Sequence, residues 1–543
     1  MSRREAWLSA GLVFIVALLV RAWAATQMPF PTPEDATYYW GAARNLVNGN
    51  GLISNALWSY ATPARDAAGG LSLGFPRPAF EIWLPLPSLL AAVPMLLLGS
   101  TAYPVTLAVM VPIGAVIPVL AWRIGADVAA ERALSPERER TLGLGSGLVA
   151  AVSLPLVLSS AVLDSTAPFG VAALAACLLG TRLLREPRGA RIRDPRLVAM
   201  GLALGVAALA RNEAIWVALG WALLAASAAG AARAQRARLV LVPAVVALAV
   251  VAPWLVRQAI TFGSPLPGQA ITNAWAISGF EIFAWKAPAT LAGYVAVGPA
   301  AWLGDRVGGL LHNLLNVLMI PGLPTAAIGL IGIPWVVTSR SLRLLVISTV
   351  ATFAITTLVF PVQTTWGTYL HSAAPAHVLL IVAGLTGLDA GIAAVGRRRG
   401  WTRPVAWLGP LFAGFAALLF MFAGIPAYAA QAGDIEARYA ALTARFAALG
   451  DPLDAAVPVI SNHPMWVSEA NQVRALALPD EPVASALDLA RTFGARYVVL
   501  DGAHGTWPAR LAADPDARCL VPVTLPGAGT APDPFRVYRI ACP

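Results

Sequence analysis

The sequence predicts a polytopic α-helical membrane protein with a small α/β domain at its C-terminal end. Of its 543 residues, 58% are hydrophobic and only 12% are charged, whereas about 25% of the residues in a soluble domain carry a charge. Apolar runs of about bilayer length recur along the chain, and in lipid such runs satisfy their backbone hydrogen bonds as helices. The formal net charge of +10 comes from arginines between these runs. This pattern indicates membrane topology and gives no sign of a nucleic-acid partner.

The arginines orient the spans, because positive residues stay on the cytoplasmic side of a membrane. Arg3 and Arg4 precede a first apolar run at about 6–25. This start resembles a signal peptide but has no convincing cleavage site, so we expect a retained helix with a cytoplasmic N-terminus. Four later arginine clusters are expected on the same side, at 182–196, 233–238, 340–343 and 397–403.

About eleven crossings satisfy this orientation. The run 80–98 would break the alternation, and its three prolines favour an interfacial or re-entrant helix. Two long outer segments, an outer loop 26–102 with in-plane helices and a second loop 257–321, then lie outside, and loops of such length are usually functional. The ten crossings after the first lie at about 103–122, 143–162, 167–184, 197–211, 214–231, 239–256, 322–338, 344–360, 375–393 and 405–425.

The chain therefore divides into a transmembrane domain, 1–426, and an extracytoplasmic tail, 427–543. In the tail, the short β-type runs "VPVIS", "RYVVLD" and "FRVYRI" alternate with helical stretches at 434–449 and 484–493, which indicates an α/β domain. Cys519 and Cys542 both lie in this tail, so a disulfide is plausible if the tail is outside the cytoplasm.

Two adjacent acids, Glu34 and Asp35, follow the first span almost directly. An acidic pair in a loop can simply be solvated. Here, however, the aromatic residues Tyr38, Tyr39 and Trp40 follow, as in an interfacial belt. Apolar residues recur at helical spacing over the next turns, so the segment can lie in the membrane plane. An acid held there can deprotonate an acceptor hydroxyl or help to hold a divalent cation such as Mg²⁺ or Mn²⁺.

Asp164 is a third acid, placed by "SLPLVLSSAVLDSTAPFG" between two apolar runs. It either caps the following helix, together with Ser165 and Thr166, or acts as a functional carboxylate at the hydrocarbon edge. The arginine-based topology puts it on the same face as Glu34 and Asp35. We therefore also consider it a second ligand for a cation held by Asp35.

Arginines on the outer side are candidates for binding an anion. Arg211 and Glu213 interrupt an apolar stretch, either as a local ion pair in a tight turn or with the arginine directed at a phosphate. Arg257 breaks the positive-inside pattern, which an anionic ligand would explain. Arg77, between two prolines in "GFPRPAFEIW", also faces outward.

Other polar residues give weaker indications. His371 and Tyr369, in "WGTYLHSAAPAHVLL", mark the start of a span, where a histidine is either a hydrogen-bonded interfacial residue or part of a site. In the tail, Asn462, His463 and Trp466 have no partner at a recognisable spacing, so we expect no catalytic group there. The candidate substrate contacts are Tyr38, Tyr39, Tyr369, His371 and Glu213.

Taken in order, these motifs make the chain resemble the GT-C glycosyltransferases. It is similar in particular to bacterial relatives of the dolichyl-phosphate-mannose protein mannosyltransferases and of the lipid A aminoarabinose transferases. The resemblance rests on "EDATYYWGAARNLVNGNGL", "FPRPAFEIWLPL", "SLPLVLSSAVLD", "GLALGVAALARNEA", "PWLVRQAITFGSPLP" and "TYLHSAAPAHVLL". They cover most of the membrane region in the expected order.

The resemblance implies a bacterial plasma-membrane enzyme that moves a sugar from a polyprenyl-phosphate carrier to a lipid, glycan or protein acceptor on the outer face. It makes Glu34 or Asp35 the catalytic acid, Asp164 the supporting acid, and Arg211 and Arg257 the ligands of the carrier phosphate. The chain departs from the pattern in two ways. Its acidic pair is Glu-Asp where many relatives begin with Asp, and "WGTYLH" lacks the arginine that relatives often place before the tyrosine.

Two other classes remain to be distinguished. A transporter or flippase of a lipid-linked or anionic substrate would place charges near the bilayer midplane and often shows repeated halves. An inactive scaffold would use the tail to bind partners. The acids here lie at one predicted face and the sequence shows no repeat, so the pattern favours the enzyme.

Overall fold

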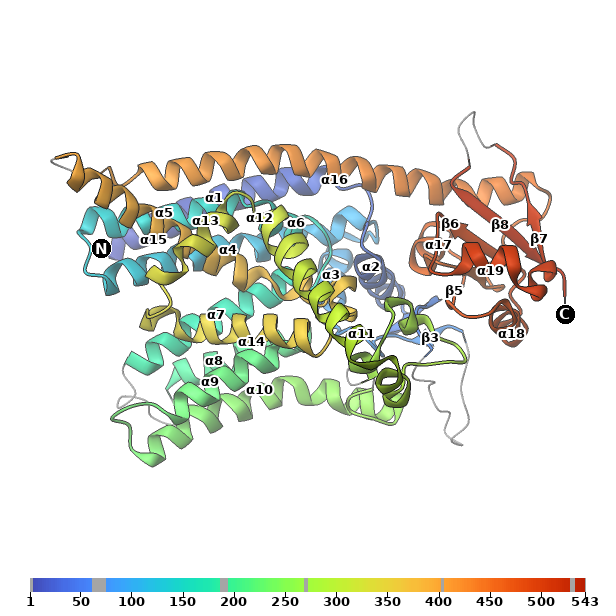
Figure 1. The fold of residues 1–543 in the computed structure, drawn as a ribbon, viewed down its shortest axis with the longest axis horizontal. Helices are drawn as coiled ribbons and strands as arrows, with labels where there is room; N and C mark the ends of the chain where they lie inside the picture. The colour runs from blue at the N-terminus through green and yellow to red at the C-terminus, as the bar shows by residue number, and fades with distance from the viewer. Residues whose placement is uncertain are drawn as a thin grey trace. The chain divides into compact units, whose positions relative to one another are not determined.

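The computed structural model describes residues 3–60, 75–185, 194–267, 272–401, 405–527 and 533–542. These residues form two compact units (Figure 1). The helical unit comprises Met1–Met28, Leu84–Trp254 and Val307–Ala429. The α/β unit comprises Pro29–Trp83, Leu255–Arg306 and Ala430–Pro543. The first outer segment and part of the second thus belong to the same compact unit as the tail.

Seven helices in the described part of the chain are long and apolar enough to cross a membrane. They are α1 (Arg3–Thr26), α4 (Tyr103–Glu131), α7 (Thr166–Arg185), α10 (Arg233–Phe262), α14 (Arg343–Leu358), α15 (Ala374–Arg398) and α16 (Leu408–Ala448). Two bent pairs raise the number to nine. The first pair is α5 (Pro136–Val152) with α6 (Leu154–Ala161), and the second joins the segment of α11 (Leu291–Leu311) and α12 (Ile320–Gly322) to that of α13 (Thr325–Gly332).

Three shorter apolar helices complete the set: α3 (Leu86–Leu98), α8 (Pro195–Ala210) and α9 (Ala214–Ala226). They have 13, 16 and 13 residues, fewer than the roughly 20 that a span needs. The described helices therefore support seven to nine crossings, and the expected number of about eleven stays a prediction. The predicted fold class, a polytopic helical membrane protein with a small α/β region, is confirmed.

Three details differ from the sequence-based expectations. Helix α11 lies within the segment 257–321 that was expected to be a loop. The single span expected at 322–338 is instead the second limb of a pair bent by 117°. The span at 405–425 and the helix at 434–449 are one continuous helix of 41 residues, α16, which runs on through Pro426.

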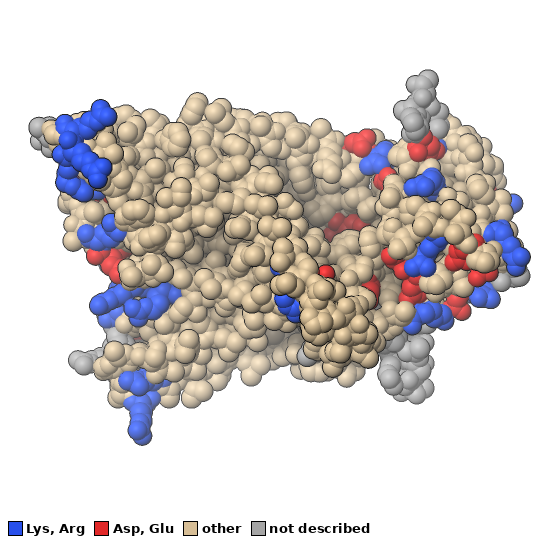
Figure 2. All heavy atoms as spheres, in the orientation of Figure 1, with Lys and Arg blue, Asp and Glu red and all other residues tan. Residues whose placement is uncertain are grey.

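The arginine clusters of the helical unit share one end, as the sequence predicts. Figure 1 shows the N-terminus, the α4–α5 and α9–α10 connections and the end of α15 at this end, and Figure 2 shows the Lys and Arg side chains gathered there on the face drawn. The segment at 340–343 joins them, because Ser341 Oγ accepts a hydrogen bond from Arg185 Nη2 at 2.6 Å. The cluster members Arg188, Arg191, Arg193 and Arg403 lie outside the described residues.

Arg21 is a fully buried arginine inside α1, and it explains the 53° break between α5 and α6. Its guanidinium donates to Ala151 O at 3.1 Å, Leu156 O at 3.1 Å and Ser160 Oγ at 3.0 Å. A helix break leaves carbonyls without intrahelical partners, and an unpaired carbonyl in lipid is costly. Gly114 on α4 leaves room for this arrangement, because a Cβ there would lie 2.2 Å from that of Ser160.

The α/β unit is built on a six-stranded sheet with the order β2-β5-β4-β6-β8-β7. The first four strands run parallel, while β8 is antiparallel to both β6 and β7. The strands are β2 (Ala56–Leu57), β4 (Val459–Ser461), β5 (Ala475–Ala477), β6 (Tyr497–Asp501), β7 (Leu520–Val523) and β8 (Phe535–Ile540). A separate pair joins β1 (Ile53–Ser54) to β3 (Arg77–Pro78).

Helices α17 (Pro464–Asn471), α18 (Val483–Phe493) and α19 (Trp507–Ala513) accompany this sheet. The three predicted β-type runs correspond to β4, β6 and β8, and the predicted helix 484–493 corresponds to α18. The remaining turns of 3₁₀-helix are Thr272–Trp275, Gly279–Phe283, Ile333–Trp335, Arg340–Leu342, Gln363–Trp366, Leu370–Ser372 and Pro515–Cys519, and a π-helix covers His312–Met319.

The expected disulfide between Cys519 and Cys542 is present and closes a loop between residues 23 positions apart. Cys519 lies in the apolar core of this unit, and Cys542 packs against that core. The same core contains Leu476, Val498 and Trp507, which are fully or almost fully buried. Cys177, in the helical unit, is buried and free. Since the disulfide joins β7 to the end of β8, it fixes the antiparallel edge of the sheet.

Candidate functional site

In the helical unit, Asp164 lies in the junction between α6 and α7 and is 6% exposed. Its Oδ2 accepts a hydrogen bond from Thr166 Oγ1 at 2.7 Å and lies 2.9 Å from Nδ1 of His371, which precedes α15. Its Oδ1 accepts from the backbone and hydroxyl of Ser165. Asp164 therefore accepts hydrogen bonds at the start of α7, as the capping interpretation predicts. It also contacts His371, another of the predicted site residues.

Arg211 occupies the junction between α8 and α9 and joins three distant segments. It donates to both carboxylate oxygens of Glu213, at 3.0 and 2.8 Å, so the expected local ion pair is present. It also donates to Ser165 Oγ at 3.1 Å and to Thr368 O at 3.4 Å. Four predicted residues, Asp164, Arg211, Glu213 and His371, are thus brought together, directly or through Ser165, within one unit.

The pKa of Asp164 follows from these contacts. Burial raises the pKa, but His371, the Thr166 hydroxyl and the Arg211 guanidinium more than offset burial, so the pKa of this carboxyl lies well below its usual range. A carboxylate with such a low pKa is a weak base and does not donate a proton near neutral pH. Asp164 is therefore suited to hold its neighbours in place rather than to transfer a proton.

Tyr369 is 1% exposed and packs within an apolar cluster. Its ring lies 5.3 Å from that of Phe353, edge to face. Its hydroxyl has no hydrogen-bond partner in the part of the chain that the structure describes. The predicted role of Tyr369 in substrate contact stays a prediction, since packing alone accounts for its ring.

In the α/β unit, the acidic pair begins helix α2 (Glu34–Val47), where the exposed N–H groups of the first turn favour negative charge. Glu34 Oε1 lies 2.9 Å from His463 Nδ1, and Glu34 Oε2 accepts from the backbone N–H of Met465 at 3.4 Å. The His463 ring stacks on Trp466 with centroids 4.3 Å apart. The sequence shows no partner for His463 at a recognisable spacing, and the structure gives it one that lies 429 residues earlier in the chain.

Helices α2 and α17 lie side by side and run parallel. Glu34 meets His463 at their first turns, and Arg44 forms an ion pair with Glu469 near their last turns. Gly41 permits the close approach, because a Cβ there would lie 2.2 Å from the Glu469 carboxylate. Burial raises the pKa of Glu469 while Arg44 opposes the shift. Sequence patterns could not identify this pair, since neither residue breaks its local helical pattern.

A chain of hydrogen bonds ties α2 to Arg257, one of the predicted cations. The backbone N–H of Phe80 donates to Tyr38 Oη at 2.6 Å, and Phe80 O accepts from Gln258 Nε2 at 2.6 Å. Arg257 donates to the side-chain oxygen of Gln258. Phe80 has φ of 71°, which costs energy for a residue with a side chain, so these bonds hold a strained backbone in place.

Arg77 lies in the same region. It donates to Glu81 Oε2 through Nε at 2.9 Å and Nη2 at 2.7 Å, and both side chains are largely buried. Burial raises the pKa of Glu81, and the ion pair with Arg77 opposes this. Burial is also the main cause of a raised pKa of Tyr38, which the charges of Arg257 and Arg77 oppose. Arg77, Arg257 and Tyr38 therefore form one electrostatic group within the unit.

Aromatic rings surround this group. Trp83 lies 4.3 Å from Tyr38 and 4.8 Å from Trp58, between ring centroids, and Phe283 lies 4.9 Å from Trp58. Tyr39 is 1% exposed and contacts Tyr38 at 6.2 Å. A small hollow of about 30 Å³, lined in part by Tyr38, Arg77 and Trp83, opens beside them. Tyr38 is thus part of the structural frame of the site, and Tyr39 lies beneath it.

The predicted cation site is not supported by the donor set. Across the described ranges, no group of three or more His, Cys, Asp or Glu side chains is arranged to hold a metal ion. Both oxygens of Asp164 already have partners, Ser165 on one and Thr166 and His371 on the other. The residues at Asp164 therefore do not fit a metal ion, and we assign no step to one.

The chain is a multi-span helical membrane protein with a small α/β region, and its fold is similar to those of solved structures of two other proteins. AglB, an oligosaccharyltransferase from Archaeoglobus fulgidus solved with an inhibitory peptide and a dolichol-phosphate, matches with a TM-score of 0.55 at 13% identity, over 92% of this chain and 70% of that one. ArnT from Cupriavidus metallidurans, bound to undecaprenyl phosphate, matches with a TM-score of 0.55 at 14% identity, over 98% of each chain.

A further structure of the Archaeoglobus fulgidus oligosaccharyltransferase, in complex with Zn and sulfate, has a TM-score of 0.53 at 15% identity, over 90% of this chain and 68% of that one. No family model and no curated protein matches the sequence. At such low identities the likeness concerns the fold, and the chemistry of this chain has to be argued from its own residues.

Proposed function

We propose that the protein is a membrane glycosyltransferase that moves a sugar from a polyprenyl-phosphate donor to an acceptor on the extracytoplasmic face. The observation that carries the proposal is the hydrogen-bond path that runs from Tyr38, one turn after the acidic start of α2, through Phe80 and Gln258 to Arg257. A base and a cation tied to one helix suit transfer from a phosphate-linked sugar. The likeness in fold to proteins solved with dolichol-phosphate and undecaprenyl phosphate supports it.

Asp35 is the proposed base. Glu34 is engaged by His463 and by the Met465 backbone, so it anchors the helix start, and Asp35 is the neighbouring carboxylate. Asp35 and Tyr38 are three residues apart in α2 and therefore lie on one face of the helix. This places the base on the helix face that carries the link to Phe80.

The reaction is a displacement at the anomeric carbon. The acceptor hydroxyl gives its proton to Asp35, and its oxygen forms the new bond to that carbon. The bond between the carbon and the carrier phosphate oxygen breaks, and the phosphate leaves with the electron pair, which inverts the configuration. A phosphate leaving group needs less protonation than the leaving group in ordinary glycoside hydrolysis, so no second acid is required.

Arg257 is the proposed ligand of the carrier phosphate. Arg77 is a second proposed ligand, which would have to exchange its ion pair with Glu81 for the phosphate. Arginine suits this role because its planar fork stays charged and can donate two parallel hydrogen bonds to phosphate oxygens. Arg211 gives most of its described hydrogen bonds to Glu213, Ser165 and Thr368, so we assign it, with Asp164 and His371, to holding helix junctions in position.

The proposed orientation follows the positive-inside rule. The arginine-rich end of the helical unit faces the cytoplasm of a bacterial cell, and the tail lies outside the plasma membrane. A disulfide in the tail fits this placement, since such bonds persist in oxidising compartments. The acceptor remains a lipid, glycan or protein.

The test uses the full chain in lipid nanodiscs with radiolabelled polyprenyl-phosphate sugars. Asp35→Asn should lower kcat/KM by roughly 10²- to 10⁴-fold, the usual size of a general-base contribution. Glu34→Gln should cost less. The control is Asp454→Asn, an exposed acid of the same unit whose side chain accepts only a local backbone hydrogen bond. It should retain full activity.

Two results would reject the proposal. Unchanged turnover in Asp35→Asn would exclude this residue as the base. If the native protein cleaves no polyprenyl-phosphate sugar but moves one across the bilayer intact, the transporter or flippase interpretation holds instead.

A further inference from the structure

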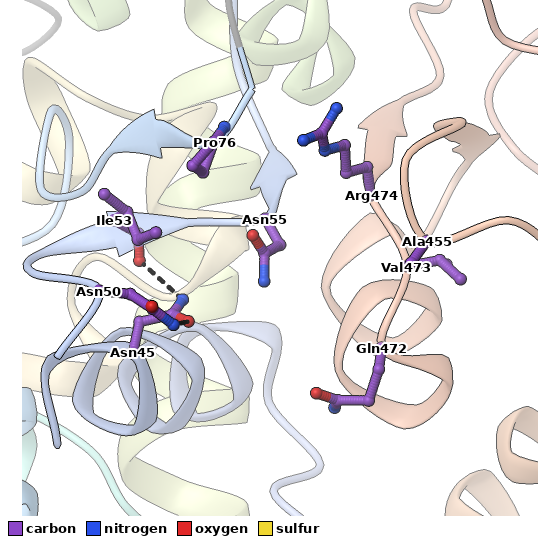
Figure 3. Close-up of a pocket in the computed structure, with 9 residues that line it drawn as sticks. All are labelled: Asn45, Asn50, Ile53, Asn55, Pro76, Ala455, Gln472, Val473 and Arg474. Atoms are coloured by element: carbon purple, nitrogen blue, oxygen red, sulfur yellow. Dashed lines mark hydrogen bonds between the residues drawn. The ribbon is translucent and has the colours of Figure 1, made fainter. Parts of the chain in front are cut away.

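A hollow in the α/β unit has a volume of about 450 Å³ and lies away from the acidic pair (Figure 3). Its residues come from two sides: the end of α2 and the strands that follow it, and the segments of the tail on either side of β4 and α17. Figure 3 shows these two sides facing each other across the hollow. The lining residues are Asn45, Asn50, Ile53, Asn55, Pro76, Ala455, Gln472, Val473 and Arg474. We call this hollow the amide pocket.

Its position along α2 is fixed by the parallel packing of α2 and α17. Glu34 and His463 meet at the first turns of the two helices, whereas Asn45 and Gln472 lie at or just past their last turns. At 1.5 Å per residue, Asn45 lies roughly 16 Å along the helix axis from Glu34. A ligand in the amide pocket would therefore be held at a distance from the reacting centre.

The chemistry of the lining is unusual. Four of the nine lining side chains are carboxamides, one is a guanidinium, and none is a carboxylate. A carboxamide carries a donor and an acceptor side by side, which matches the paired hydroxyls of a sugar ring. Three of the four already bond within the protein: Asn45 Nδ2 donates to Ile53 O, Asn50 Nδ2 to Asn45 Oδ1 and Gln472 Nε2 to Glu469 O. A saccharide would use their remaining N–H groups and oxygens together with the amide of Asn55. The volume is within the range typical of small-ligand sites. The single positive charge of Arg474 favours neutral or anionic saccharides over cationic ones.

The backbone groups around the pocket are already engaged. Ile53 O accepts from Asn45 Nδ2 at 3.1 Å, and Asn55 O accepts from the backbone N–H of Ala475 at 3.0 Å. Arg474 donates to Ala456 O at 3.1 Å, and its guanidinium lies 5.8 Å from the ring centre of Phe75. An extended peptide that adds a strand needs open backbone groups. Side-chain amides facing the hollow therefore favour a saccharide over a peptide.

We infer that the amide pocket binds the distal part of a saccharide acceptor whose reacting end lies at Asp35. This inference rests on the proposed function and names its acceptor class. Contacts remote from the reacting centre contribute to transfer only when the acceptor is long enough to reach them. Acceptors of several sugar units should thus benefit from the pocket, and short acceptors should not.

Direct binding is the first test. The full chain in nanodiscs is incubated with an array of defined neutral, uronic-acid and amino-sugar oligosaccharides, and the best-binding oligosaccharide is then titrated. Asn55→Ala and Arg474→Gln should each weaken its binding by roughly tenfold or more, as expected for lost hydrogen bonds. Arg539→Gln, an exposed arginine of β8 outside the pocket, is the matched control and should bind normally.

Acceptor length is the second test. In transfer assays, Arg474→Gln should raise KM for the long acceptor and leave the short acceptor unchanged, and Arg474→Lys should recover part of the loss. Thermal-shift measurements check that each variant is folded. An equal loss for both acceptor lengths, or no loss for either, would overturn the inference.

The two proposals fail in different ways. Asp35→Asn should still bind the oligosaccharide, because the pocket is separate from the base. The native protein could bind the oligosaccharide through the pocket and yet transfer no sugar. That result would reject the proposed function and leave the pocket as a saccharide-binding site. Pocket-dependent binding of unglycosylated peptides with no binding of oligosaccharides would overturn the saccharide inference and leave the transferase proposal standing.

Discussion

Each unit contains one carboxylate–histidine pair with the same geometry but a different environment. Asp164 and His371 in the helical unit, and Glu34 and His463 in the α/β unit, both have 2.9 Å between carboxylate oxygen and Nδ1. The first pair is 8% and 9% exposed at its side chains, and hydroxyl groups complete its contacts. The second is 15% and 30% exposed.

The difference shows that distance alone does not assign a role. The Asp164 carboxylate is saturated by its neighbours and has a pKa well below the usual range, so it is part of the structure. Glu34 is nearer to water, so its contact with His463 can adapt when a substrate binds. We therefore expect the same mutation to act on stability in one unit and mainly on activity in the other.

The largest expected effect is on stability, in Asp164→Ala. Removing one partner of a buried, hydrogen-bonded pair leaves charged neighbours uncompensated and costs about 3–5 kcal/mol. The equivalent change Glu34→Ala, in the more exposed pair, should cost at most about 1 kcal/mol. Thermal-shift measurements on the two purified variants compare them directly. Equal shifts would show that burial does not separate the two pairs.

Loss of the disulfide should act on the α/β unit alone. Replacing Cys519 and Cys542 together with serine removes a cross-link between residues 23 positions apart, which the chain-entropy model values at about 3 kcal/mol. Hydrogen exchange of peptides from β7 and β8 should accelerate, while peptides from α7 should not change. Cys177→Ala, in the helical unit, is the control. Unchanged exchange in β7 and β8 would contradict the prediction.

The two units should also differ in their response to acid. Burial lowers the pKa of His504, in the α/β unit, to about 4. Between pH 6.5 and 4 the unfolded chain therefore binds a proton that the folded unit does not, so stability falls as the pH falls, by up to about 3 kcal/mol. Asp164 stays ionised throughout this range, so its cluster adds no such loss.

Hydrogen exchange measured at pH 7 and pH 5, corrected for intrinsic rates, tests this contrast. Peptides around β6 should lose protection at pH 5, and those around α7 should not. His504→Gln keeps a donor toward Leu478 O, which lies 2.9 Å from Nε2, but cannot titrate. If His504→Gln shows the same loss as the native protein, another group is responsible.

The smallest expected effect is that of His463 on turnover. His463→Leu removes the contact that anchors Glu34 beside Asp35, which should lower kcat/KM by roughly tenfold, the value of one hydrogen bond to a charged group. His463→Asn retains an amide donor at the position of Nδ1 and should recover most of the activity with an unchanged melting temperature. Equal loss in both variants would indicate that His463 acts in some other way than by positioning Glu34.

Local patterns predicted the architecture well, because span length and arginine position are both read from short stretches of sequence. These two signals predicted the helices and the end of the helical unit at which the arginine clusters lie. In the tail, short apolar runs and paired cysteines predicted β4, β6, β8 and the disulfide. Asp164, Arg211, Glu213 and His371 were each singled out because an apolar run ends there, but their mutual contacts were not predicted, and their role in a site stays a prediction.

The contacts that were missed join residues hundreds of positions apart. Glu34 with His463 and Arg44 with Glu469 are 429 and 425 residues apart, and no spacing rule covers such pairs. Arg21 is different, because a signal was present: a charged residue inside an apolar run is rarely without a partner. It was treated as part of a simple span, although its position pointed to the break between α5 and α6.

Strand β2 has a consequence for how the protein is made. It comes from the first outer segment, yet it pairs with β5 in the tail, and nearby Tyr60 donates to Ala477 O, 417 residues later. At synthesis rates of about 5–20 residues per second, this early segment waits roughly 20–80 s for its partner to emerge. During that interval its backbone groups are an open edge for other extended chains. Truncated chains that end before β5 keep that strand edge unpaired. We expect such fragments to be prone to aggregation and to be targets of protein quality control at the membrane.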